Sequence, residues 1–284
     1  MRVITSVAAM KSAAARHKAA GRTIGLVPTM GYLHEGHLSL VRASKRAADA
    51  TVVSIFVNPS QFGPREDLKG YPRDFERDAR LLRTEGTDIL FHPRPEEMYP
   101  PGYKTYVEVH DLQNRLCGIS RPTHFRGVCT IVLKLFSIVR PDRAFFGQKD
   151  AQQAVIIRKM ARDLDLDVRV DIRPIVREPD GLALSSRNVY LSPAERRAAL
   201  VLTRSLKEAN IMAKSGERRV AAILTRIRSR IASEPLARLD YAAVVDPETL
   251  EPLSAVRGRA LVALAVFIGR TRLIDNVTIR PGTR

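Results

Sequence analysis

The stretch that most constrains the fold runs from Thr23 to Leu40 and reads TIGLVPTMGYLHEGHLSL. Its first apolar residues, 24–27, form a run short enough for one buried strand. Pro28 lacks the N–H that a strand ladder uses, so we expect the strand to end there. A turn over residues 29–31 then leads into a helix. Open α/β sheets bind ligands beyond the carboxyl ends of their strands, and a helix N-terminus attracts anions.

Two histidines lie at the start of this predicted helix. His34 and His37 are three residues apart, and Gly36 lies between them. An imidazole N–H donates to phosphate oxygens, and a glycine lets a phosphate approach the backbone. The pattern therefore indicates a site for nucleotide phosphates, although capping or surface histidines would show the same spacing. A metal site is disfavoured, because no third His or Cys is nearby and Glu35 should point elsewhere.

The first half of the chain alternates strand-like and helix-like segments. We expect strands at 51–57, 88–91, 144–146 and 168–172, and helices at 37–49, 72–86 and 125–139. A further strand is expected at Thr105–Val109, where the side chains alternate in character. Alternating strands and helices with short connections predict an α/β fold: a Rossmann-like doubly wound parallel sheet with helices on both faces.

The pattern changes after residue 176. Two helices are expected between residues 193 and 233, followed by strands at 241–245, 260–267 and 273–279. Helices followed by strands are typical of an α+β domain. We therefore divide the chain into a Rossmann-like domain over residues 1–176 and a smaller α+β C-terminal domain over residues 177–284.

Further polar residues follow other predicted strands. Asn58 and Gln61 lie in a turn-rich loop after the second strand, where their amides can face the same cleft as the histidines. Ordinary turn chemistry is an equal alternative for Asn58. Lys149 lies in a second strand–glycine–polar turn–helix arrangement, which places another cation at a helix N-terminus. Gln153 lies in the first turn of that helix.

A loop at 185–187 offers a second candidate phosphate site. Ser185, Ser186 and Arg187 supply two hydroxyls and a guanidinium, which together can hold a phosphate. The alternative is a loop that serves only to cap the helix beginning at Pro193. Because we find no convincing Ser-His-Asp or Cys-His set, activation of a substrate by cations and N–H donors fits better than a protein nucleophile.

Charge and cysteine content limit the partners. The net charge is +17, from 47 basic and 30 acidic residues, which invites a nucleic-acid hypothesis. The basic residues are interleaved with acids, so small anionic substrates are the better explanation and no nucleic-acid partner is expected. Two cysteines without a CxxC pattern favour a reducing, cytoplasmic location. No apolar run reaches 18 residues, so no membrane partner is expected.

Four stretches together resemble the pantoate–β-alanine ligase (pantothenate synthetase) family of the nucleotidyltransferase superfamily with the HxGH signature. They lie in order between residues 28 and 191 and read PTMGYLHEGHLSL, FVNPSQFGPREDLKGYPR, HFRGVCTIVLKLFSIVRPDRAFFGQKDAQQ and DGLALSSRNVYL. Their combination is more specific than any one motif. Thr123 is one departure, because the family usually has glycine at this position.

The resemblance implies an ATP-dependent ligase that condenses (R)-pantoate with β-alanine through a pantoyl adenylate, releasing AMP and pyrophosphate. It also implies Mg²⁺ and a homodimer. Gln61 and Gln153 match the positions that hold pantoate, and Gln61 also lies beside β-alanine. His34, His37 and Lys149 are the catalytic candidates, and His37 matches the family's assigned acid residue. The implied ATP-binding positions are Met30, Gly31, Tyr32, Leu33, His34, Glu35, Gly36, His37, Gly147, Gln148, Lys149, Asp150, Val176, Leu184, Ser185, Ser186 and Arg187.

Two other functions stay open at this point. A different nucleotidyltransferase would also release pyrophosphate but would join AMP or CMP to another acceptor, and product analysis separates the two enzymes. A basic nucleic-acid-binding protein with a nucleotide-type fold would bind with a steep dependence on salt.

Overall fold

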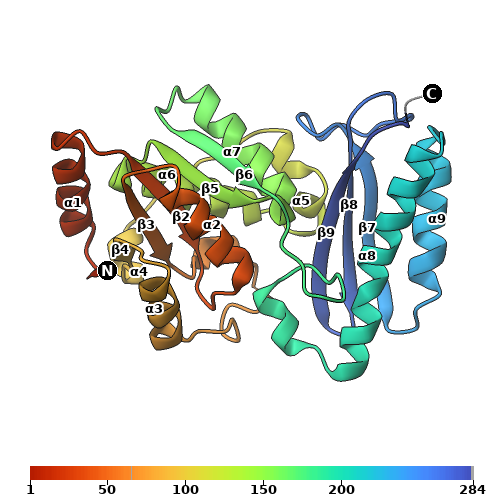
Figure 1. Ribbon diagram of the computed structural model, residues 1–284, viewed down its shortest axis with the longest axis horizontal. Coiled ribbons are helices and arrows are strands. Elements are labelled where there is room, and N and C mark those ends of the chain that lie inside the picture. The colour runs from red at the N-terminus through yellow and green to blue at the C-terminus, as the bar shows by residue number, and fades with distance from the viewer. Residues whose placement is uncertain (65, 283–284) are drawn as a thin grey trace. The chain divides into compact units, whose positions relative to one another are not determined.

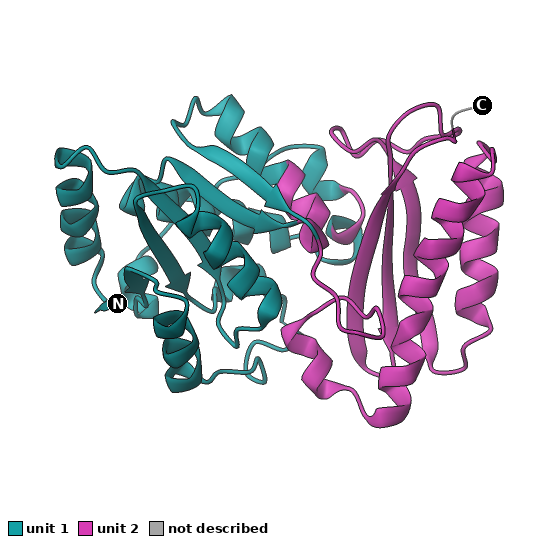
Figure 2. Cartoon of the chain, in the orientation of Figure 1, with its two compact units in different colours: residues 1–114, 118–147, 156–174 teal, residues 115–117, 148–155, 175–284 magenta. Residues whose placement is uncertain are grey.

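The computed structural model describes residues 1–64 and 66–282 (Figure 1). Arg65, which belongs to the second of the four family-like stretches, lies outside the described residues, as do residues 283–284. Two compact units make up the described chain (Figure 2). The first comprises residues 1–114, 118–147 and 156–174, and the second comprises residues 115–117, 148–155 and 175–284. A domain boundary between residues 176 and 177 stays a prediction.

The first unit contains a six-stranded parallel sheet with the strand order β1-β4-β3-β2-β5-β6. The predicted parallel α/β sheet is thereby confirmed. Its first strand, at residues 2–4, was not predicted. The strands are β1 (Arg2–Ile4), β2 (Ile24–Thr29), β3 (Ala50–Ile55), β4 (Ile89–Phe91), β5 (Arg143–Gly147) and β6 (Arg169–Arg173).

The strand order reverses direction between β2 and β5. From β2 the chain continues to β3 and β4 on one side, whereas β5 and β6 are added on the other side. Open α/β sheets bind their ligands at such a switch point, beyond the carboxyl ends of the strands. Here those ends are Thr29 of β2 and Gly147 of β5. The switch point thus lies where the sequence placed the histidine loop and the turn that leads to Lys149.

Helices cover both faces of this sheet (Figure 1). Val27, Val53 and Leu90 of the strands share one apolar cluster with Leu40 of α2 and Leu82 of α3. On the other face α6 packs against β2 and α1, and its apolar length is largely buried, as expected. The α-helices that begin before residue 175 are α1 (Val7–Ala19), α2 (Glu35–Lys45), α3 (Phe75–Thr84), α4 (Pro95–Met98), α5 (Cys117–Ser120), α6 (His124–Val139) and α7 (Ala151–Asp163). Among the described residues, every helix is too short or too polar to span a bilayer.

Two local predictions in the first unit were wrong. Pro28 does not end its strand but pairs in register with Ser54 of β3. The registered pairing of β2 with β5 stops at Leu26, so at Pro28 the ladder continues on the β3 side alone. Thr105–Val109 is not a strand: the N–H of Val107 donates to Oγ1 of Thr130, 3.0 Å away, instead of to a neighbouring strand. Alternation of side chains predicts an extended segment, but a strand also needs a partner.

The second unit contains an antiparallel sheet with the order β7-β8-β9. Its strands are β7 (Ala237–Val245), β8 (Ala260–Ile268) and β9 (Thr271–Ile279), and two helices, α8 (Pro193–Lys214) and α9 (Val220–Ala232), pack against it (Figure 1). Leu202, Ile223 and Leu264 belong to the apolar core between the helices and the sheet. The predicted α+β arrangement at the C-terminal end of the chain is confirmed.

Short 3₁₀ helices occupy several loops of the described chain. They are η1 (Pro59–Gln61), η2 (Leu112–Asn114), η3 (Gln148–Asp150) and η4 (Ser186–Tyr190). Three of them contain predicted site residues, which the sequence had placed in irregular turns. Thr123, the departure from the family pattern, is the N-cap residue of α6, and its side chain makes no capping hydrogen bond there.

Candidate active site

The loop between β2 and α2 is held by a buried carboxylate. Gly31 and Tyr32 both have positive φ angles, 85° and 50°, which turn the chain sharply after β2. Asp78 of α3 accepts the N–H groups of Tyr32 and Leu33 at 2.6 and 2.8 Å. Burial raises the pKa of Asp78, while these two N–H donors oppose the rise. A Cβ at Gly31 would lie 3.1 Å from the Asp78 carboxylate, so a side chain there would press on this contact.

His34 and His37 cap the helix that they begin. Nδ1 of His34 accepts the N–H of Gly36 at 3.2 Å, and Nδ1 of His37 accepts the N–H of His34 at 3.3 Å. The two rings lie with their centroids 4.0 Å apart. A nitrogen that accepts carries no hydrogen, so each neutral imidazole has its hydrogen on Nε2. The capping alternative is therefore confirmed, and it is compatible with a role for both rings as Nε2–H donors.

Two other members of the predicted nucleotide loop have partners within the first unit. Glu35 forms an ion pair with Arg42 of the same helix. The thioether of Met30 accepts a hydrogen bond from Nε2 of Gln61 at 3.2 Å. The structure thus brings together Met30 and Gln61, which the sequence assigned to nucleotide and pantoate respectively.

Asn58 is the centre of a buried network that holds the loop after β3. Its side chain is 1% exposed. Oδ1 accepts from the N–H and the hydroxyl of Ser60, at 3.4 and 2.9 Å, and from the hydroxyl of Tyr99 at 2.8 Å. Nδ2 donates to the carbonyl of Gly127 and to Oε1 of Gln61, both at 3.0 Å. The polar atoms of the Asn58 side chain therefore do two things: they stabilise the turn and they orient Gln61.

The backbone on both sides of this network is tightly packed. A Cβ at Gly127 would come within 2.4 Å of the Ser60 carbonyl oxygen, so α6 and η1 approach closely only because this residue is glycine. The carbonyl of Gln61 accepts from Arg121 at 3.3 Å and is 2.9 Å from Nδ1 of His124. Tyr99 is half-buried, and burial raises its pKa to about 12. Gln61 is therefore held at its backbone carbonyl and at Oε1, and one hydrogen of Nε2 is donated to Met30.

Lys149 lies in η3, between β5 and α7, as the repeated strand–glycine–turn–helix pattern predicted. Its side chain is 21% exposed, and its ammonium is 4.0 Å from the carboxylate of Asp150. Two carbonyls of this turn, those of Gln148 and Lys149, accept hydrogen bonds from Nδ2 of Asn276 on β9, at 2.9 and 3.0 Å. The turn that carries Lys149 is therefore fixed from the three-stranded sheet of the same unit.

The two glutamines at the start of α7 have different surroundings. Gln152 is buried: its Oε1 accepts the N–H of Cys117 at 3.0 Å and its Nε2 donates to the carbonyl of Arg115 at 2.6 Å. It anchors the segment at 115–117. Gln153 is half-buried, and its assignment to pantoate stays a prediction.

The loop from Val176 to Arg187 is a short hairpin-like turn. The N–H of Leu184 donates to the carbonyl of Val176 at 3.1 Å, so two predicted nucleotide contacts lie side by side. The hydroxyl of Ser185 accepts the N–H of Arg187 at 3.3 Å and caps η4. Ser186 is buried. The helix that begins at Pro193 is instead capped by Ser192, so the 185–187 loop does not serve as its cap. A phosphate contact from this loop stays a prediction.

The described residues contain no group of three or more His, Cys, Asp or Glu side chains that could hold a metal ion. Mg²⁺ in nucleotide enzymes is usually bound by substrate phosphates, waters and one or two carboxylates.

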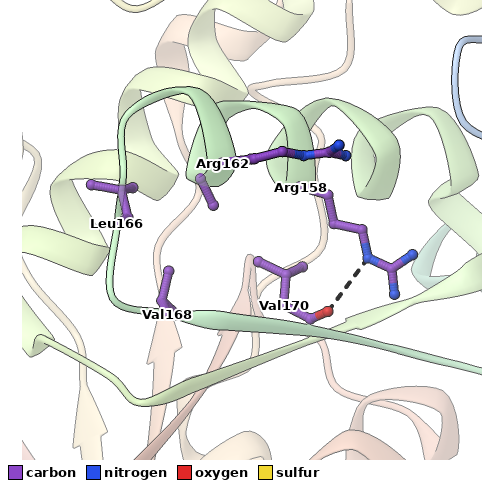
Figure 3. A pocket seen from close by; sticks show the side chains of 6 residues that line it. Arg158, Arg162, Leu166, Val168 and Val170 are labelled. Atoms are coloured by element: carbon purple, nitrogen blue, oxygen red, sulfur yellow. Dashed lines mark hydrogen bonds between the residues drawn. The ribbon is translucent and has the colours of Figure 1, made fainter.

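A shallow hollow on the first unit lies away from the predicted residues. Figure 3 shows it between α7 and β6, where the Arg158 guanidinium donates to the carbonyl of Val170 at 3.4 Å. Its lining consists of four apolar residues and two arginines. The residues that line it are Arg158, Ala161, Arg162, Leu166, Val168 and Val170, and none of them belongs to the predicted site.

Sequence reasoning missed three residues that support the candidate site: Asp78, Tyr99 and Asn276. A signal existed for two of them. Asp78 lies beside Ala79 and Leu82 on the apolar face of a predicted helix, and Asn276 lies between Ile274 and Val277 in a predicted strand. An acid or amide in such a position must find buried partners. Tyr99 lies in a proline-rich segment, and the sequence pattern there did not indicate that it supports the site.

Comparison with known proteins places this geometry in a family. The family model described as Pantoate-beta-alanine ligase matches residues 2–278. Pantothenate synthetases from Pelotomaculum thermopropionicum and Acetivibrio thermocellus are 56% and 57% identical over 279 residues, each covering 98% of this chain and 99% of the relative.

Solved structures agree with this result. A pantothenate synthetase from Thermus thermophilus is 48% identical, with a TM-score of 0.94 and coverage of 99% of this chain and 100% of the other. The pantoate–β-alanine ligase of Francisella tularensis, solved with β-γ ATP and β-alanine, is 33% identical with a TM-score of 0.81, covering 98% and 97% of the two chains. With the HxGH helix beginning at the switch point of its parallel sheet, and with relatives similar along nearly its whole length, this chain belongs to the pantoate–β-alanine ligase family.

Proposed function

We propose that the chain condenses (R)-pantoate with β-alanine in the ATP-dependent reaction for which its family is named. An oxygen of the pantoate carboxylate attacks the α-phosphorus of ATP, the bond to the bridging oxygen breaks, and pyrophosphate leaves. The β-alanine amine then attacks the acyl carbon of pantoyl adenylate and AMP leaves. The nitrogen loses a proton, and the product is pantothenate.

The observation that carries this proposal is the capping pair of histidines at the switch point. Their two Nε2–H groups are fixed donors at a helix N-terminus, where negative charge is stabilised. Preorganised donors of this kind stabilise the charge that develops on phosphate oxygens in the transition state. Carboxylate activation needs such donors and no protein nucleophile. A GxxxxGK[ST] loop, which would indicate a different phosphate chemistry, is absent from the sequence.

We assign His37 the role of a hydrogen-bond donor instead of a proton-releasing acid. Its Nδ1 lone pair is used to accept the N–H of His34. Adding a proton at Nδ1 would remove this capping bond, and a neutral imidazole does not readily release its Nε2 hydrogen. Lys149 is proposed to supply positive charge to the phosphates, and His34 to donate through Nε2 in the same way as His37.

Gln61 is proposed to bind a substrate carboxylate through Nε2. Asn58 occupies Oε1, so the amide presents its donor end. Pantoate and β-alanine both carry a carboxylate, and an amide donor binds one without the cost of burying another charge. Gln153 is proposed to act as a second such donor. Asn58 then contributes to substrate binding by orienting Gln61.

The remaining nucleotide contacts are carried over to this chain as part of the proposal. They are the backbone of residues 30–36, the turn at 147–150, and the loop that contains Val176, Leu184, Ser185, Ser186 and Arg187. A magnesium ion bound to the ATP phosphates would neutralise part of their charge. Within this proposal the side chains named above bind, orient and donate.

Three further parts of the proposal concern the setting of the enzyme. We propose a homodimer in the cytoplasm, with small molecules and not nucleic acid as its ligands. Cys117 and Cys129 are both buried and form no disulfide, which fits a reducing compartment. Light scattering at the exit of a sizing column should give twice the mass of the chain, and a monomer at micromolar concentration would refute the dimer.

Product analysis tests the proposed reaction. The protein is incubated with ATP, D-pantoate and β-alanine, and all products are measured by mass spectrometry. We expect pantothenate, AMP and pyrophosphate in equal amounts, and a single burst of pyrophosphate when β-alanine is left out. ADP with inorganic phosphate would overturn the mechanism. AMP joined to another acceptor would favour a different transferase, and salt-sensitive binding of DNA or RNA without ligase activity would favour a nucleic-acid-binding protein.

A further inference from the structure

Asp275 and Asn276 are adjacent polar residues in the middle of β9. Successive side chains of a strand point to opposite faces. Asp275 lies on the face that carries Leu273 and Ile279 into the core beneath α8, and Asn276 lies on the other face. Both side chains are nearly inaccessible, with 2% and 4% exposed. Two buried polar groups in the middle of a strand must each be satisfied by specific partners.

The partners of Asn276 are the residues of the turn that carries Lys149. Nδ2 donates both of its hydrogens, to the carbonyl of Gln148 at 2.9 Å and to the carbonyl of Lys149 at 3.0 Å. Oδ1 accepts from Nε2 of Gln148 at 3.2 Å. One amide thus bonds to the turn in three places, and two of these bonds are to backbone, whose position they set directly.

The partners of Asp275 lie in the loop that leads to Ser185. Its carboxylate accepts a two-pronged contact from Arg177, at 2.7 and 2.9 Å. Arg177 also donates to the carbonyl of Gly181 at 3.1 Å, and Thr203 of α8 donates to the same carbonyl at 2.8 Å. A carboxylate oxygen of Asp275 further accepts the backbone N–H of Asn276 at 2.8 Å. These two neighbouring residues of β9 therefore anchor two separate segments: the turn that carries Lys149 and the loop that leads to Ser185.

We propose that Asn276 is a positioning residue for the adenylation step, acting through Lys149. The inference rests on the proposed function, in which the Lys149 ammonium stabilises phosphate charge. A lysine is a point charge on a flexible stem, so its backbone origin decides which oxygens it can reach. Asn276 fixes that origin through the carbonyl of Lys149 itself. A misplacement of about 1 Å near the chemistry can lower a rate by about 10²-fold.

A double-mutant cycle on the full chain tests this assignment. Asn276→Ala, Lys149→Ala and the double variant are compared with the parent in single-turnover formation of pantoyl adenylate from ATP and D-pantoate. We expect Asn276→Ala to slow this step by about 10²-fold, and the double variant to be no slower than Lys149→Ala alone. Rate losses that multiply in the double variant would overturn the assignment, because Asn276 would then act independently of Lys149.

Stability is separated from positioning by two further variants. Asn276→Ser is the milder change, since its hydroxyl keeps one donor, and it serves if Asn276→Ala does not fold. Val277→Ala loses packing in the same strand without touching the turn. We expect Val277→Ala to lower Tm and leave the adenylation rate unchanged, and Asn276→Ser to slow adenylation at a comparable Tm. Equal rate losses in both variants would assign Asn276 a merely structural role. A parent protein that forms no adenylate at all would instead refute the proposed function.

Discussion

Nδ2 of Asn58 lies 3.0 Å from Oε1 of Gln61, so the two side-chain amides form a directed hydrogen bond. Its direction is set by the other partners of Asn58. The Gly127 carbonyl can only accept and the Ser60 N–H can only donate, which fixes the ends of the Asn58 amide. Gln61 must then turn Oε1 toward Asn58 and Nε2 away from it. A carbonyl of α6 thereby determines which end of the Gln61 amide points away from Asn58, and in the proposed site this is the end that binds a substrate.

Asn58→Asp should reverse the orientation of Gln61. The carboxylate at position 58 has no hydrogen to donate, so it would repel both Oε1 of Gln61 and the Gly127 carbonyl. Rotating the Gln61 amide by 180° would place Nε2 toward the carboxylate and remove the first of these two repulsions. Substrate carboxylates would then meet Oε1. Because a hydrogen bond to a charged group contributes about 1.5–3 kcal/mol, we expect the KM for pantoate to rise by about 10- to 100-fold. Steady-state kinetics with pantoate and β-alanine varied in turn measure this change.

Two controls accompany this variant. Gln61→Glu removes the same Nε2 donor directly and should raise the KM for pantoate by a similar factor. Asn114→Asp makes the same charge change at an exposed position of the first unit and should leave KM unaltered. An Asn58→Asp enzyme with the parent KM would show that the amide pair does not orient Gln61.

His37→Asn should separate capping from catalysis. The Asn oxygen can take the place of Nδ1 and accept the N–H of His34, but it supplies no donor at the position of Nε2. Losing one preorganised donor costs about 2.7–4 kcal/mol, or about 10²–10³ in the single-turnover rate of adenylate formation. Stability should hardly change. His37→Ala removes the cap as well and should lose a further ~1 kcal/mol of unfolding free energy.

The control for this pair of variants is His37→Gln, whose amide nitrogen reaches toward the position of Nε2. It should recover part of the rate lost in His37→Asn while losing the cap. Chemical denaturation and single-turnover kinetics are run on the same preparations. If His37→Asn forms adenylate at the parent rate, the Nε2 hydrogen does not contact the reacting phosphates.

Tyr99→Phe should weaken the support of Asn58 without removing it. The hydroxyl of Tyr99 donates to Oδ1 of Asn58, while Ser60 continues to donate to the same atom. We expect a loss of about 0.5–1.5 kcal/mol in unfolding free energy and a small rise in the KM for pantoate. The pKa of Tyr99 is raised to about 12 by burial, above its ordinary value of 10.0. The contribution is therefore complete below about pH 10 and is lost as the pH rises through about 12.

Urea unfolding of the parent and of Tyr99→Phe between about pH 8 and pH 12 measures this effect. The difference between the two proteins should shrink above about pH 10. Tyr106→Phe removes a hydroxyl at an exposed position and serves as the control for the loss of a tyrosine hydroxyl near neutral pH, where it should change the unfolding free energy little. A difference that stays constant across this range would show that the Tyr99 hydroxyl is not enclosed.

The fold was predictable where the spacing of apolar side chains along the sequence indicates which residues are buried. Val52 and Val53 lie in a strand buried on both faces, and the continuous apolar run around them predicted it. The pairing of Pro28 with Ser54 was not predictable, because it depends on which neighbour the strand has at that point. Thr105–Val109 has the alternating side chains of a strand, but its backbone bonds to a side chain instead of to a neighbouring strand.

The candidate site divides in the same way. The sequence predicted His34, His37 and Lys149 as site residues, because each follows a glycine-containing turn at the end of a predicted strand. Their supports were not visible as such. Asn276 lies 127 positions from Lys149 along the chain, and Asp78 lies 45 positions from Leu33. A contact between residues so far apart is decided by the fold, which a local pattern does not contain.

Asp171→Asn should make the acid stability of the first unit less steep. Burial raises the pKa of Asp171, but a two-pronged contact from Arg143 at 2.8 and 2.9 Å, together with Arg169, outweighs burial and lowers the pKa below 3.8. A lowered carboxyl pKa contributes stability above the unfolded value of about 3.8, and that stability is lost as the pH falls through the folded value. The difference in unfolding free energy between parent and variant should therefore be constant near neutral pH and shrink below about pH 4.

Asp163→Asn, which breaks an exposed helical pair with Lys159, is the control and should change little at any pH. A parent–variant difference that persists unchanged at about pH 2 would mean that the Asp171 carboxylate does not gain its stabilisation from the Arg143 pair.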